Sequence, residues 1–253
     1  MGLDFRRHFV ERAPLFRGLG RVRCEELVAL AQDRRVARKA SFFRQGDATV
    51  EVMVLCAGRL KLTQVLPGGI ELILRLTNPG EAFGSLDTAW GGASPVSAEA
   101  LEASHALAWE RAALDAFAGR NTVVLHNQVR IVCERLHRLE QRYAELVTQR
   151  VPQRVAQALL RLAVQVGQAV PGGVLVSLSR EELAQLAGTT LFTVSRLFGD
   201  WEARGLVTPR REGVIVTDAE KLAMLIEHAE AMAANGDAVS HGARAQSRGT
   251  GSP

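Results

Sequence analysis

The 253-residue sequence predicts an α+β protein that combines a small β barrel or sandwich, a long helix and a winged helix-turn-helix domain. Three observations lead to this fold class. Short alternating or β-branched runs, separated by Gly and Pro clusters, occupy residues 33–110. Apolar residues at heptad spacing occupy residues 111–149. Two short helical patterns around a glycine, followed by a hairpin, occupy residues 183–217.

The N-terminal domain, residues 1–110, places helices before a strand-rich segment. Residues 1 to about 32 have apolar residues at helical spacing, with a break at APLFRGLG. The segment LPGGIE indicates a hairpin because Gly68 and Gly69 can both adopt positive φ. Strands are predicted in VEVMVLCAG, RLKLTQVL, IELILRLT, SAEALEA and HALAWE. Several strands at this spacing favour one small barrel or sandwich.

Residues 111–149 predict a long helix with a narrow apolar seam. Apolar residues recur every seven positions in two series that are three or four residues apart, as in a dimeric coiled coil. For any single turn, an amphipathic helix packed on its own domain is the alternative, but the length of the repeat favours dimerisation. The predicted dimer contacts are Leu125, Val129, Val132, Leu136, Leu139, Tyr143 and Leu146.

The C-terminal domain is predicted over residues 150–234, after a hinge at residues 148–152. Pro152 suits the first turn of a new helix, where its missing N–H costs nothing. Residues 235–253, NGDAVSHGARAQSRGTGSP, have almost nothing to bury and are expected to form a disordered tail.

A helix-turn-helix is predicted inside this C-terminal domain. Leu183 and Ala184 are expected to begin its first helix, and Gly188 to end it in the left-handed conformation. Thr189 or Thr190 can then cap the second helix. The strand-like LVTPRREGVIVTD adds a hairpin, which makes the motif winged. These features together favour DNA binding, with a winged helix used for protein contact as the alternative.

The composition excludes several classes of protein. A net charge of +4 is mildly basic, which suits an anionic partner. Three scattered cysteines indicate a reducing compartment and argue against an iron–sulfur cluster. The start MGLDFRRHFVERAP has no apolar core and no run approaches a membrane span, so a cytoplasmic protein without membrane contact is expected. No nucleophile–base set, metal-ligand spacing or phosphate-binding glycine loop is recognisable, so neither an enzyme nor a metal site is expected.

Residues 10 to about 225 resemble the catabolite activator/fumarate-nitrate regulator (Crp/Fnr) family of bacterial transcription factors. The segments that carry the resemblance are LVSLSREELAQLAGTTLFTVSRLF, WEARGLV, GVIVTD, FFRQGD and CAGRLKLTQVLPGGIELILRLTNPGEAFG. The resemblance implies an N-terminal β-roll like the jelly roll of cyclic-nucleotide-binding domains, a long dimerisation helix and a C-terminal winged helix-turn-helix. It also implies a homodimer on a two-fold symmetric double-stranded DNA operator, with RNA polymerase as a further partner.

The resemblance identifies residues 190–204 as the recognition helix. Where Leu191 and Phe192 stand, the family has polar base-reading residues, often Arg followed by Glu. Arg196 matches the family's second base-reading Arg, which can donate to O6 and N7 of a guanine. Leu191 and Phe192 can contact a thymine methyl, with Phe192 folded back onto its own domain as the alternative. The predicted DNA contacts are Arg180, Thr189, Thr190, Leu191, Phe192, Thr193, Ser195 and Arg196.

The cassette that family members use to bind cyclic AMP is degraded in this sequence. Ser85 stands in place of the ribose-binding Glu, and Val96 precedes Ser97 where the phosphate-pairing Arg is expected. Leu139 and Glu140 replace the hydroxyl-bearing pair of the dimer helix. These departures argue against cyclic AMP and leave the effector open. The candidate effector-binding residues are Glu81, Ser85, Ser97 and His126.

The alternative function is a haem- or small-molecule-binding sensor, whose DNA binding depends on an unidentified effector or is vestigial. The candidate haem ligands by residue type are His8, His105, His126 and His137. Cys56 and Cys133 could form a redox pair or a thiol sensor, but their apolar neighbours favour small core residues.

Overall fold

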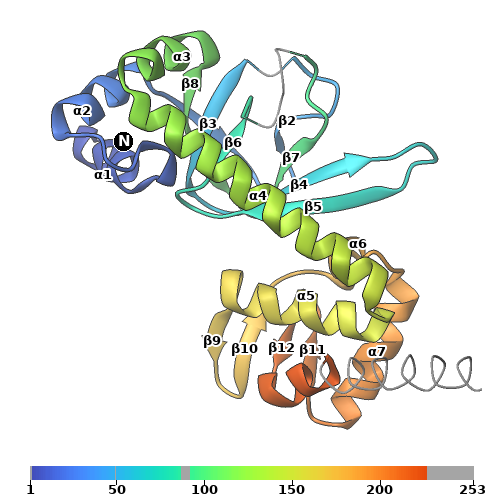
Figure 1. Ribbon diagram of the computed structural model, residues 1–253. Helices are drawn as coiled ribbons and strands as arrows, with labels where there is room; N and C mark the ends of the chain where they lie inside the picture. Colours follow the sequence, from blue (N-terminus) through green and yellow to red (C-terminus); the bar gives the residue numbers. More distant parts are fainter. Residues whose placement is uncertain (1, 49, 87–91, 227–253) are drawn as a thin grey trace, which may run out of the picture. The chain divides into compact units, whose positions relative to one another are not determined.

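A computed structural model describes residues 2–48, 50–86 and 92–226 of the chain (Figure 1). The chain forms two compact units, Met1–Gln141 and Arg142–Pro253. The tail predicted at residues 235–253 lies outside the described residues. None of the described helices combines the length and the apolar composition needed to cross a membrane.

The N-terminal unit contains two four-stranded antiparallel sheets, in the orders β1-β8-β3-β6 and β2-β7-β4-β5. The five predicted strands are confirmed, and they are β3 (Glu51–Ala57), β4 (Leu60–Val65), β5 (Glu71–Thr77), β7 (Ser97–Ala100) and β8 (Ser104–Glu110). Sequence reasoning missed β1 (Gln32–Val36), β2 (Ser41–Phe43) and β6 (Ala82–Gly84). The β-roll implied by the family resemblance is therefore present.

Strand β3 explains why this unit has two hydrophobic cores. Val52, Val54 and Cys56 point to one face of their sheet, and Met53 and Leu55 point to the other, because side chains alternate along a strand. The second face packs against the inner face of the β2-β7-β4-β5 sheet. A strand buried on both faces needs a continuous apolar run, which is what VMVLC provides.

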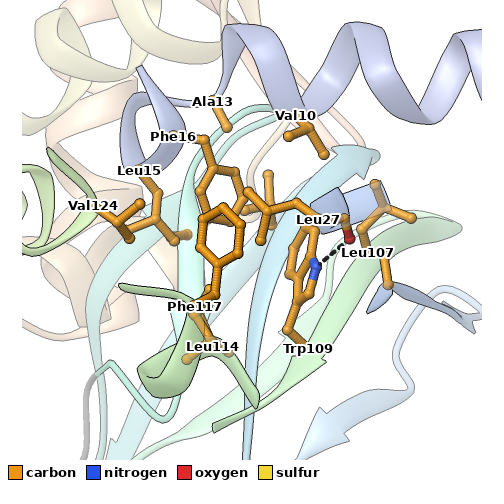
Figure 2. Packing of buried hydrophobic residues seen from close by; sticks show 14 of the residues in the cluster. Val10, Ala13, Leu15, Phe16, Leu27, Leu107, Trp109, Leu114, Phe117 and Val124 are labelled. Carbon is orange, nitrogen blue, oxygen red and sulfur yellow. Dashed lines mark hydrogen bonds between the residues drawn. The ribbon is translucent and has the colours of Figure 1, made fainter. Parts of the chain in front are cut away.

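Helices cover the outer face of the β1-β8-β3-β6 sheet (Figures 1 and 2). Trp109 of β8 lies in this core, where its indole N–H donates to the Leu27 carbonyl at 2.8 Å and its ring contacts Phe16. Phe117 also lies in this cluster. The covering elements are α1 (Leu3–Arg12), the 3₁₀ turn η1 (Pro14–Phe16), α2 (Arg21–Leu30), α3 (Arg111–Arg120) and the start of α4 (Thr122–Thr148).

Three polar side chains join α1 to this sheet. Asp33 of β1 accepts a hydrogen bond from Nε2 of His105 on β8 at 2.6 Å and pairs with the Arg6 guanidinium of α1. Burial by itself would raise the pKa of Asp33, but the hydrogen bonds from Arg6 and His105 outweigh it and hold that pKa below its usual range. The N-terminal helix is therefore an integral part of the β-roll unit.

The prediction of one helix over residues 111–149 is wrong at Asn121, where the chain breaks into α3 and α4. Asn121 leaves the helical conformation at φ −137° and ψ 76°, and its side-chain amide donates to the Phe117 carbonyl at 2.9 Å. Its own carbonyl accepts from the N–H of Val124 at 3.0 Å. One residue thus ends α3 and opens α4, so the predicted seam belongs to α4 alone.

The C-terminal unit has a four-stranded antiparallel sheet in the order β11-β12-β10-β9, and helices α5, α6 and α7 follow α4 along the chain (Figure 1). Helix α4 ends at Thr148 and α5 begins at Val151, whereas the two compact units divide between Gln141 and Arg142, so the hinge at residues 148–152 stays a prediction. The elements in chain order are α5 (Val151–Val166), β9 (Gln168–Val170), β10 (Gly173–Val176), α6 (Arg180–Ala187), α7 (Leu191–Ala203), β11 (Val207–Arg210) and β12 (Gly213–Val216).

Candidate nucleic-acid interface

Helix α6 starts earlier than predicted, at Arg180 and not at Leu183. Ser179 is the N-cap, and its hydroxyl accepts from the N–H of Glu182 at 3.1 Å. The Glu182 carboxylate accepts in return from the N–H of Ser179 at 2.8 Å. This reciprocal pair is a capping box, so two free N–H groups of the first turn are satisfied. The sequence S-R-E-E already contained this signal.

Gly188 turns the chain from α6 toward α7, as predicted. Its φ of 61° and ψ of 49° lie in the left-handed region, where a residue without a side chain is favoured. The guanidinium of Arg154 on α5 donates to the carbonyls of Ala187 and Gly188, both at 3.2 Å. The positively charged Arg154 side chain therefore satisfies the carbonyls at the C-terminus of α6, and these hydrogen bonds attach the turn to α5. Sequence reasoning did not identify Arg154.

Of the two candidate caps for α7, the structure selects Thr190. Its hydroxyl accepts from the N–H of Thr193 at 3.3 Å, and the two hydroxyls lie 3.0 Å apart. The buried face of α7 is formed by Val194, Leu197, Phe198 and Trp201. This face anchors α7 on its unit, so the opposite face is held outward.

The outward face of α7 begins with two apolar side chains. Leu191 is 44% exposed and Phe192 is 85% exposed. The alternative in which Phe192 folds back onto its own domain is therefore wrong. Arg196 follows one turn after Phe192 on the exposed side, and within the described residues its side chain makes no hydrogen bond or ion pair. Its guanidinium is available to an external partner.

Arg180 and Ser195 meet between the two helices. The Arg180 guanidinium donates to the Ser195 hydroxyl at 3.4 Å and lies 5.8 Å from the centre of the Phe198 ring. The predicted site residues Arg180, Thr190, Thr193, Ser195 and Arg196 therefore belong to one region built on α6 and α7. Thr189, in the turn, donates its N–H to the Ala184 carbonyl at 3.0 Å.

The predicted wing is present and is larger than expected. Strands β11 and β12 form the hairpin with Arg210 opposite Gly213, and β12 also pairs with β10. The β9–β10 hairpin at residues 168–176 was missed, because its strands are short and no long alternating pattern marks them. The wing therefore rests on a sheet and not on a lone hairpin.

The predicted dimer contacts form an exposed stripe on α4. Their side chains are between 41% and 69% exposed within one chain. Charged groups flank them, as where Glu134 pairs with Arg130 and with Arg138, each at 3.6 Å. The residues of the stripe are Leu125, Val129, Val132, Leu136, Leu139, Tyr143 and Leu146.

The four candidate effector-binding residues have separate local environments. Glu81 accepts from the N–H of Asn78 at 3.2 Å, and Ser97 accepts from the N–H of Gln45 at 2.9 Å. Ser85 is buried, and its carbonyl accepts from Arg111 at 2.8 Å, whereas His126 is exposed on α4. Within the described residues, these four side chains are not seen to form one common binding site.

Val96, which the family resemblance places at the phosphate-pairing arginine, is buried in the cluster between the two sheets. That cluster also contains Phe43 and Phe83, whose rings are stacked. An apolar residue in this place offers a phosphate no charge-assisted hydrogen bond.

The histidines and cysteines do not gather into a metal or redox site in the described residues. No cluster of three or more metal-ligating side chains occurs there. Cys56 is a core residue, as predicted, and burial raises the pKa of its thiol to about 11. Cys133 is exposed on α4, which contradicts its assignment to the core, because helical periodicity turns it away from the packed side.

The fold and this site define a class of protein, a transcription regulator with a β-roll sensor domain and a winged helix-turn-helix DNA-binding domain. Residues 153–225 match the model of the Crp-like helix-turn-helix domain, and residues 33–121 match that of the cyclic nucleotide-binding domain. The chain belongs to the Crp/Fnr family.

Several relatives are similar over almost their whole length. The cyclic AMP receptor protein of Thermus thermophilus is 31% identical over 221 residues, which cover 87% of this chain and 99% of that protein. The CRP-like cAMP-activated global transcriptional regulator of Mycobacterium tuberculosis is 28% identical over 214 residues, with coverages of 84% and 96%. The crystal structure of another CRP-family transcriptional regulator from Thermus thermophilus gives a TM-score of 0.68 at 26% identity, with coverages of 77% and 96%.

Substitution of Gly188 tests whether the turn between α6 and α7 requires a glycine. Gly188→Ala should destabilise the C-terminal unit by about 1–2 kcal/mol, because a left-handed non-glycine residue is strained. The new Cβ would also lie 3.3 Å from Cδ2 of Leu146. Urea unfolding followed by circular dichroism measures the change.

Gly199→Ala is the matched control for that variant. Gly199 lies inside α7, and a Cβ there would have nothing within 4 Å. The control should therefore stabilise the unit by about 0.5–1 kcal/mol through helix propensity. If Gly188→Ala left the unfolding midpoint unchanged, or raised it as Gly199→Ala should, the turn would not depend on glycine.

Proposed function

We propose that this regulator acts as a homodimer and reads a two-fold symmetric DNA operator through α7. The observation that carries the proposal is the division of α7 into two faces. One face is buried against its own unit, whereas Leu191, Phe192 and Arg196 point outward without partners in the described chain. A helix held in this way after a glycine turn is the geometry that enters a major groove.

The exposed stripe on α4 supports the dimer. Seven apolar side chains at heptad spacing would remain in water in a monomer, and burying them against a second copy removes that cost. Flanking ion pairs such as Arg130–Glu134 suit the rim of such a seam. Two-fold symmetry of the protein then requires two-fold symmetry of the operator.

Arg196 is assigned to base reading, and the polar groups around it are assigned to orientation. A guanidinium on the exposed face can donate two hydrogen bonds to O6 and N7 of one guanine. Arg180, Thr190 and Thr193 lie at helix N-termini, where phosphate contacts are favoured. Regulation of transcription further implies contact with RNA polymerase, which we include as a partner.

We do not include cyclic AMP as the signal. One relative is described as cAMP-activated, which favours cyclic AMP as a ligand. The buried Val96, however, would leave the phosphate of cyclic AMP without a cationic partner. The haem alternative is also left out, because His105 is hydrogen-bonded to Asp33 and the other three candidate ligands, His8, His126 and His137, are exposed. The dimer is therefore expected to bind its operator without any added effector.

Selection of bound duplexes from a random library tests this function. We expect protein purified without added effector to enrich one two-fold symmetric site, and its affinity for that site to be unchanged by cyclic AMP. The visible spectrum of the same preparation, recorded beforehand, reports any haem. Enrichment that appears only after cyclic AMP is added would contradict the effector part, and no enrichment under either condition would contradict the DNA-reading part.

A further inference from the structure

The first turn of α7 presents an apolar surface where a reader of base edges would present polar groups. Leu191 and Phe192 directly follow the cap residue Thr190 and are 44% and 85% exposed. Neither side chain can donate or accept a hydrogen bond. Whatever they recognise in a major groove must therefore be recognised by apolar contact.

The major groove offers one apolar group to such a surface. Among the four bases, thymine alone carries a methyl group, at C5. A cytosine methylated at C5 places a methyl at the same position of the groove edge. To an apolar side chain, thymine and 5-methylcytosine are therefore alike, whereas unmethylated cytosine and uracil lack the group.

We infer that the first turn of α7 reads the C5-methyl groups of pyrimidines, so that methylation of cytosine at this position strengthens operator binding. This inference rests on the proposed function and names the chemistry that its recognition helix selects. Phe192 is the main contact, because nearly all of its ring surface is free to be buried. Leu191 adds a smaller contact beside it.

The position of Arg196 predicts where the methyl group lies in the operator. Phe192 and Arg196 are four residues apart, so their side chains are neighbours on one helix face, about 5–6 Å apart at Cβ. Adjacent base pairs are about 3.4 Å apart along the duplex. The methylated pyrimidine should therefore lie within about two base pairs of the guanine that Arg196 reads.

The test uses the selected operator and the full-length protein. At each thymine near the guanine assigned to Arg196, the nucleotide is replaced in both half-sites by deoxyuridine opposite adenine, or by cytosine or 5-methylcytosine opposite guanine, and dissociation constants are measured. Losing one methyl contact should weaken binding about fourfold, so the symmetric pair should weaken it about fifteenfold. Replacing cytosine by 5-methylcytosine at the same positions should restore a similar factor.

Protein variants connect the effect to the side chain. Phe192→Ala should remove most of the difference between thymine and deoxyuridine, and Leu191→Ala a smaller part. Both residues are exposed, so neither change opens the core. Val164→Ala is the matched control, because Val164 is an apolar residue of α5 that is 90% exposed, and the full difference should persist.

The outcomes separate this inference from the function on which it rests. If an operator is selected but deoxyuridine binds as tightly as thymine at every position, methyl reading is overturned while DNA reading stands. If the difference survives in Phe192→Ala combined with Leu191→Ala, another residue reads the methyl and the assignment is overturned. If no duplex is enriched, the proposed function itself fails.

Discussion

Arg196→Ala should greatly reduce the preference of the protein for its operator over unrelated DNA. A bidentate arginine–guanine contact contributes about 1–3 kcal/mol of discrimination, and a symmetric dimer makes two of them. Specific affinity should therefore fall about thirtyfold or more, while weak binding that depends on salt remains. The ratio of dissociation constants for operator and unrelated duplex, measured at one salt concentration, is the quantity to follow.

Two further variants make the Arg196 result interpretable. Arg196→Lys keeps the positive charge but loses the planar pair of donors, so specificity should fall nearly as far as in the alanine variant. Arg204→Ala removes an exposed arginine at the C-cap of the same helix and should leave the ratio almost unchanged. Full specificity in Arg196→Ala, or an equal loss in Arg204→Ala, would contradict base reading by Arg196.

The turn of the DNA-binding unit could be predicted because its signals are local. The turn needs a residue in the left-handed conformation, and Gly188 provides it. Thr190 caps α7 by accepting from the N–H of Thr193, three residues away. The capping box of Ser179 and Glu182 is equally local and marks the start of α6 at Arg180. Such features require only neighbouring residues, so the sequence contains them in full.

Features that depend on pairing between distant segments could not be predicted. Strand β1, with the polar sequence QDRRV, exists because it pairs with β8, which lies much further along the chain. Strand β10 pairs with β12 across the whole helix-turn-helix. Arg154 bonds to Gly188 from another helix, with no sequence signal that marks it. The site residues within each helix could thus be predicted from the sequence. The strand pairing and side-chain contacts that hold these helices in place could not.

The apolar stripe on α4 could be predicted only in part from the sequence. Its heptad spacing could be predicted, and the structure adds that the seven side chains are exposed within one chain. Such exposure favours a further partner over packing on their own domain alone. Exposure does not identify what covers these side chains, and a second copy of the chain remains our proposal. A test must therefore separate loss of the dimer from loss of the fold.

Leu136→Asp combined with Leu139→Asp should give a folded monomer. The two leucines are 55% and 60% exposed in one chain, so the β-roll core does not depend on them. In the dimer, four leucine side chains would be buried, each contributing about 1 kcal/mol or more, and carboxylates in their place would be costly to desolvate. The dimer dissociation constant should rise at least about a thousandfold. Size-exclusion chromatography with light scattering, over a range of protein concentrations, measures it.

Val164→Asp is the matched control for the seam, because it introduces the same charge at an apolar residue of α5 that is 90% exposed. This variant should remain dimeric and bind the operator normally. Circular dichroism should report native helix content in both variants, since the substitutions lie on exposed helical faces. A double variant that is folded and still dimeric would remove the seam from the proposal, and the symmetric operator would then need another interface. A folded monomer that binds a single half-site weakly would connect α4 directly to the affinity of α7 for DNA.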